Sequence, residues 1–125
     1  MNLIELQRGL FAAKKEIDEA MVAYEAAIRA DAIADDESRR AKSRSYLTSR
    51  EQLGGKATVG AIEAAVDLET SELQMRARLA EGLKRSASQA VESRRQWLSA
   101  LQSLASLTKA EAQLAKWEPR ETESV

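Results

Sequence analysis

Residues 3–28 read LIELQRGLFAAKKEIDEAMVAYEAAI, and their apolar side chains recur in two interleaved series with a period of seven residues. The first series holds large side chains, and the second is mostly Ala. The first series is Leu3, Leu10, Ile17 and Tyr24, and the second is Leu6, Ala13, Ala20 and Ala27. Two apolar positions per heptad are typical of a helix that packs along a partner in a coiled coil. The next position in register is Asp31, so we predict a coiled-coil helix over residues 1–34.

The composition of the whole chain favours the same secondary structure. Of 125 residues, 71 are Ala, Glu, Lys, Leu or Arg, whereas only 20 are Val, Ile, Thr, Phe, Tyr or Trp. The first group is typical of long helices and the second supplies the residues that strands prefer. We therefore predict an all-α fold, in which the protomer is a helical hairpin or coiled coil with a long C-terminal helix.

The apolar content is too small to give one copy of the chain a large core. Leu, Ile, Val and Phe together number 25 residues, and Ala buries little surface per side chain. We therefore expect a homo-oligomer, either a ring or a bundle. The residues predicted to form its interface are the large apolar ones of the first and last helices: Leu3, Leu6, Leu10, Ile17, Met21, Tyr24, Ile28, Leu79, Leu83, Trp97, Leu101 and Leu104.

Further helices are predicted from the charge pattern and from turn residues. The net charge of −1 conceals blocks: residues 1–37 carry −5, 38–56 carry +5, 57–75 carry −4 and 76–109 carry +5. Asp35-Asp36 resembles a helix start and Gly54-Gly55 a helix end, which predicts a basic helix over 37–53. A long helix is predicted over 58–116, and the pattern does not decide whether it is interrupted at Thr70-Ser71. We therefore expect residues 1–116 to form one helical domain. Residues 117–125 are charged and contain Pro119, and we expect them to be disordered.

The basic helix is the most informative segment for function. Cations, hydroxyls and one aromatic ring gather there, which suits contact with phosphates and stacking on an exposed base. The predicted nucleic-acid-binding residues are Arg39, Arg40, Lys42, Arg44, Tyr46, Arg50 and Lys56. The alternative is a solvated helix whose charges pair with the acidic blocks.

Several function classes are excluded or disfavoured. The chain has no His and no Cys, which excludes zinc sites of the Cys/His type and nucleophiles that depend on Cys or His. Gly54-Gly55-Lys56 lacks the earlier Gly of a phosphate-binding loop. We therefore expect no enzyme, no cofactor, no metal site and no catalytic residue.

No signal peptide or membrane-spanning run is recognisable, and we expect a cytoplasmic protein without a membrane partner.

Short motifs over roughly residues 1–105 resemble the UvsY-like recombination mediators of T-even-type bacteriophages. The opening Leu3-Ile-Glu-Leu-Gln7 with Leu10, the run Lys42-Ser-Arg-Ser-Tyr46, and Thr58-Val59 followed by Leu73-Gln74 are similar to elements of that family. This chain departs from the family in a shorter loop around Gly54-Gly55 and in having one aromatic residue in the basic element.

The resemblance implies a ring-forming helical protein that binds single-stranded DNA. It also implies two protein partners, a phage RecA-like recombinase and the single-strand-binding protein that the recombinase replaces, and a place in the host cytoplasm. The alternative function is a structural or scaffold coiled-coil oligomer, such as a phage assembly factor or a secreted helical hairpin, without any nucleic-acid role.

Overall fold

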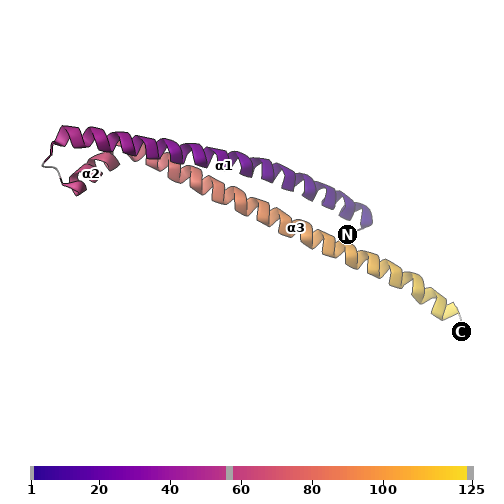
Figure 1. The fold of residues 1–125 in the computed structure, drawn as a ribbon. Coiled ribbons are helices and arrows are strands. Elements are labelled where there is room, and N and C mark those ends of the chain that lie inside the picture. The colour runs from indigo at the N-terminus through magenta and orange to yellow at the C-terminus, as the bar shows by residue number, and fades with distance from the viewer. Residues whose placement is uncertain (1, 56–57, 124–125) are drawn as a thin grey trace. The chain divides into compact units, whose positions relative to one another are not determined.

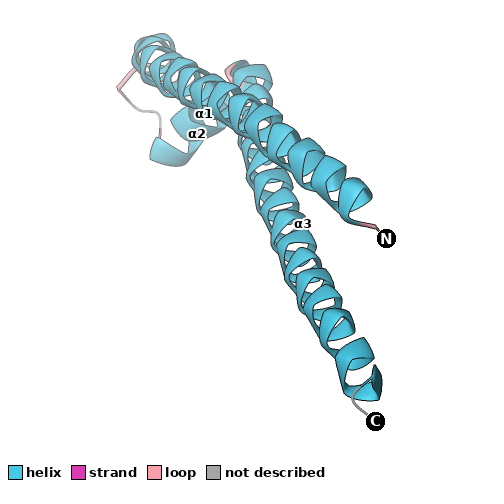
Figure 2. Ribbon diagram, turned by 90° about the vertical axis from the view of Figure 1, so that its right-hand side faces the viewer, coloured by secondary structure: helices cyan, strands magenta, loops and turns pink. Residues whose placement is uncertain are grey.

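The computed structural model describes residues 2–55 and 58–123, with side chains as far as Lys116. Its three helices are α1 (Leu3–Leu53), α2 (Val59–Glu69) and α3 (Ser71–Glu123) (Figure 1). No strand occurs in the described ranges (Figure 2). The all-α prediction is therefore confirmed.

Where the sequence predicts two helices, over 1–34 and 37–53, α1 is continuous. Asp35 and Asp36 do not cap a new helix. Instead they form ion pairs one turn ahead, Asp35 Oδ2 with Arg39 Nε at 3.0 Å and Asp36 Oδ2 with Arg40 Nε at 3.1 Å. Such pairs support the interior of a helix, and neither Gly nor Pro interrupts the chain between Leu10 and Leu53. α1 ends before Gly54, whose φ of 72° suits glycine.

The predicted helix over 58–116 is two helices that meet at Thr70. Thr58 caps α2 by accepting a hydrogen bond at Oγ1 from the amide of Ala61 at 3.2 Å. At the other end, Thr70 has φ −100° and ψ 9°, and its buried hydroxyl donates to the carbonyl of Val66 at 2.7 Å. The hydroxyl therefore satisfies a carbonyl at the end of α2 where the chain turns into α3.

The C-terminal segment also differs from its prediction. α3 continues through Pro119 to Glu123, so residues 117–123 are helical where the sequence predicts disorder. Proline removes one backbone hydrogen bond but does not always end a helix. Ser124 and Val125 lie outside the described residues.

The chain divides into two compact units. The first, Met1–Val22 with Gln89–Val125, has a core of Leu6, Ala13 and Leu101, with Leu10 and Leu98 packed against it. Gly9 faces Leu101: a Cβ placed at Gly9 would lie 3.8 Å from the nearest methyl carbon of Leu101. Small residues in α1 therefore let a large side chain of α3 approach closely.

The second unit, Ala23–Ser88, contains α2 and the adjoining parts of α1 and α3. Its buried residues are largely hydroxyl-bearing. They are Ser38, Ser45, Ser49 and Thr70, together with the apolar Ile62 and Val66. The Ser45 hydroxyl donates to Glu69 Oε2 at 2.7 Å, which joins α1 to the end of α2. In Figure 1, α2 runs beside the C-terminal end of α1.

Within the described part of the chain, no helix is long and apolar enough to cross a membrane.

We expect Leu101→Ala to lower the free energy of unfolding by about 2–5 kcal/mol, because it leaves a cavity beside Leu6 and Ala13. Leu107→Ala, at a side chain that is 61% exposed, should cost less than about 1 kcal/mol. Urea denaturation followed by circular dichroism measures both. Equal destabilisation of the two variants would contradict the packing of the first unit.

Candidate nucleic-acid interface

The predicted cations of the basic segment lie on α1 and are exposed. Arg39, Arg40, Lys42, Arg44 and Arg50 all present their side chains to solvent. The small side chains Ser38, Ser45 and Ser49 are buried. This segment therefore uses a narrow polar face for packing and leaves the cations outside.

Four residues of this segment line one shallow hollow. Arg39, Arg40, Ser43 and Arg44 surround a volume of about 450 Å³. A 3.6-residue turn places residues 39, 40, 43 and 44 as neighbours, so the local helix alone assembles the hollow. The hollow is open to solvent and its wall is mostly apolar, so the aliphatic stems of the arginines form most of it. The three guanidinium groups and the Ser43 hydroxyl on this face offer hydrogen-bond donors to an anion.

The ion pairs leave most of these donors free. Asp35 and Asp36 contact Arg39 and Arg40 through Nε, and each guanidinium has two further nitrogens that carry four N–H groups. These pairs are highly exposed and contribute little energy. The carboxylates therefore orient the arginines while their outer nitrogens remain able to donate to a phosphate.

Tyr46 differs from the arginines in its surroundings. Its side chain is half-buried and lines a groove between α1 and α2 together with Leu47 and Val66. The ring therefore forms part of a groove wall and is not a free platform on the surface. The nearby Thr48 hydroxyl donates to the carbonyl of Arg44 at 3.0 Å, so its hydrogen is already used within the helix.

Lys56, the remaining predicted nucleic-acid contact, lies outside the described residues.

The predicted interface residues divide by exposure. Leu6 and Leu101 are buried and Leu10 packs against them within a single chain. Ile17, Met21 and Tyr24 are half-buried. The others are exposed: Leu3, Ile28, Leu79, Leu83, Trp97 and Leu104. Part of the heptad seam therefore serves intrachain packing, and the exposed part stays available for a partner.

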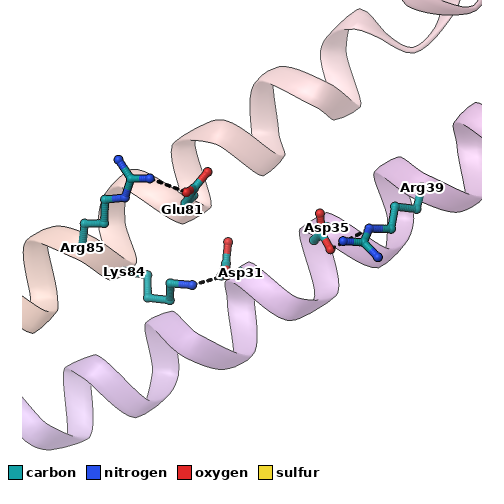
Figure 3. Close-up of polar contacts among 6 residues, drawn as sticks. All are labelled: Asp31, Asp35, Arg39, Glu81, Lys84 and Arg85. Atoms are coloured by element: carbon teal, nitrogen blue, oxygen red, sulfur yellow. Dashed lines mark hydrogen bonds and ion pairs between the residues drawn. The ribbon is translucent and has the colours of Figure 1, made fainter.

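An ion pair links α1 to α3 in the second unit. Lys84 Nζ lies 2.8 Å from Asp31 Oδ2, while Asp35–Arg39 and Glu81–Arg85 are pairs within one helix (Figure 3). The hydrogen bond and charge of Asp31 raise the pKa of Lys84 above its ordinary value of 10.5, and Glu81 adds to this effect. An ion pair with a lysine that is charged at neutral pH therefore joins the two helices.

Sequence reasoning misses two features of this region. The acidic side of the groove, Glu63 and Asp67, carries no motif. The hydroxyls of the basic segment are interpreted from sequence only as phosphate contacts, whereas Ser38, Ser45 and Ser49 are buried. Together with Ala41 these serines recur at intervals of three, four and four residues, so small side chains share one face of the helix. This pattern could have indicated a close contact with another helix.

Comparison of the chain with protein-family models, with curated proteins and with solved structures finds no match in any of the three.

We expect Lys84→Met to weaken the second unit at neutral pH. Because the folded pKa of Lys84 lies above 10.5, the stability that this lysine contributes is complete below pH 10.5 and is lost as pH rises through the folded value. Denaturation at pH 9 and pH 11.5 measures the free energy of unfolding of both proteins. The difference in this free energy between wild type and variant should be larger at pH 9. Lys14→Met, at an exposed lysine, is the control. A difference that grows toward pH 11.5 would contradict the role of the pair.

Proposed function

We propose that this protein binds the phosphate backbone of single-stranded DNA through the exposed cations of α1. The hollow of Arg39, Arg40, Ser43 and Arg44 carries the proposal. The guanidinium groups of Arg39 and Arg40 are oriented by carboxylates at Nε and keep their outer nitrogens for an anion. Among the described residues, Lys42, Arg44 and Arg50 form no ion pair with a carboxylate.

Repetition of this surface in a homo-oligomer would raise its affinity. A single shallow hollow makes few contacts, but several copies on one strand act at a high effective concentration. Exposed apolar rows support association: Leu79 and Leu83 on α3 are 63% and 67% exposed and lie one turn apart. Such rows are unusual on a protein that stays monomeric.

The resemblance to UvsY-like proteins extends the proposal to a role in recombination. In that role, the oligomer helps a phage RecA-like recombinase replace single-strand-binding protein on DNA in the cytoplasm of the host. The motifs that carry the resemblance include Lys42-Ser-Arg-Ser-Tyr46, which belongs to the same segment as the cationic surface.

The second candidate function is a scaffold that associates through its helices and binds no nucleic acid. The exposed apolar side chains favour it equally, because they require a partner but not DNA. The two functions differ in one property, which is the binding of an oligonucleotide at low salt.

We expect the double variant Lys42→Ala/Arg44→Ala to bind a labelled single-stranded oligonucleotide more weakly, whatever its sequence. The slope of log affinity against log salt should flatten by about 0.7 for each phosphate that the variant no longer neutralises. Fluorescence anisotropy over a salt series measures both effects. The control Lys14→Ala/Lys15→Ala removes the same charge from an exposed part of α1 outside the basic segment. Unchanged binding in the first variant, or equal weakening in the control, would contradict the assignment.

We expect Leu83→Glu to reduce the size of the oligomer, since it places a charge in the exposed apolar row. Light scattering coupled to size exclusion should give wild type a mass well above the 13.8 kDa of one chain. Ser99→Glu adds the same charge at an exposed position of α3 outside that row and should leave the mass unchanged. A wild-type chain that elutes as a monomer would contradict the proposed oligomer.

A further inference from the structure

The groove between α1 and α2 is lined by both apolar and polar side chains. It has a volume of about 710 Å³, opens to solvent and is lined by Lys42, Ser43, Tyr46, Leu47, Glu63, Val66 and Asp67. Val66 is 6% exposed and Tyr46 is half-buried, so both present fixed surfaces. An aromatic ring and aliphatic side chains beside a few polar groups are suited to a flat, partly polar ring.

The groove adjoins the arginine hollow. Ser43 lines both cavities, with Arg39, Arg40 and Arg44 in the hollow and Lys42 and Tyr46 in the groove. In a nucleotide, the base and the phosphate are separated by one sugar. A strand whose phosphate occupies the hollow can therefore place a base across Ser43 and into the groove.

The two carboxylates on the α2 wall of the groove favour this orientation over its reverse, and Lys42 lies on the opposite wall, on α1. Glu63 and Asp67 are one turn apart on α2 and form an acidic wall. Asp67 Oδ1 accepts one hydrogen bond, from Gln74 Nε2 at 3.2 Å, and no ion pair holds Glu63 within the described residues. The wall repels phosphate, but its oxygens can accept hydrogen bonds from amino groups of a base.

We propose that the α1/α2 groove holds one nucleobase that bears an exocyclic amino group, with Tyr46 against its ring and Glu63 or Asp67 accepting from its amine. This inference rests on the proposed DNA-binding function and adds base selectivity to it. Cytosine, adenine and guanine carry such an amine, whereas thymine carries none. Thymine has a single imide N3–H between two carbonyl oxygens, and these oxygens are repelled when they face a carboxylate.

The test compares oligo-dC with oligo-dT of equal length by fluorescence anisotropy. Wild type should bind oligo-dC about three- to tenfold more tightly, as expected for one additional hydrogen bond. The double variant Glu63→Gln/Asp67→Asn should bind both with similar affinity, because an amide donates as well as accepts. Glu25→Gln/Glu92→Gln removes the same charge at two exposed positions outside the groove and should retain the preference.

A second measurement follows the base itself. A 2-aminopurine placed within oligo-dT carries an amino group and changes its emission when it enters a stacked site. Wild type should change this emission and Glu63→Gln/Asp67→Asn should change it less, while circular dichroism confirms that both are helical. Equal affinity of wild type for oligo-dC and oligo-dT, or a preference that persists in the double variant, would overturn the base site. Absence of binding to either oligonucleotide would instead overturn the DNA-binding function as a whole.

Discussion

The hydrogen bond from Ser45 Oγ to Glu69 Oε2, 2.7 Å long, ties α1 to the end of α2. It exists because the face of α1 toward this contact carries only small side chains, Ser38, Ser45 and Ser49, all buried. Small residues allow two helix backbones to approach, and the buried Ser45 hydroxyl then finds its acceptor in the carboxylate of the exposed Glu69. The groove beside Tyr46 depends on this contact, since its two walls belong to the two helices that the contact joins.

The same segment shows how packing and charge are divided around one helix. Ser38, Ser45 and Ser49 are buried, the arginines face solvent, and Tyr46 is half-buried. Asp35 and Asp36 complete the arrangement because they restrain two arginines through Nε without covering their outer nitrogens. Acidic residues near a proposed anion site therefore need not oppose it. Their position one turn away lets them orient the cations of the proposed site.

The all-α fold and the exposure of the cations could be predicted from the sequence, because composition and helical periodicity are local properties. The helix boundaries could not be predicted in the same way. Asp35-Asp36 has the composition of a helix start, and only its pairing with Arg39 and Arg40 shows that it belongs to a helix interior. The groove could not be predicted either, because Glu63 and Asp67 join Tyr46 only through the packing of α2 against α1. The heptad pattern also does not distinguish an interface between copies from packing within one chain, which is where Leu6 and Leu101 lie.

The hydroxyl-rich interior of the second unit has a thermodynamic consequence. Exposure of apolar surface raises the heat capacity on unfolding and exposure of polar surface lowers it. Four of the six buried side chains described in this unit bear hydroxyls, so we expect a smaller heat-capacity increment on unfolding than for a unit of equal size with an aliphatic core. A smaller increment flattens the stability curve, so warming or cooling should change the stability of the groove-bearing unit less than that of such a unit.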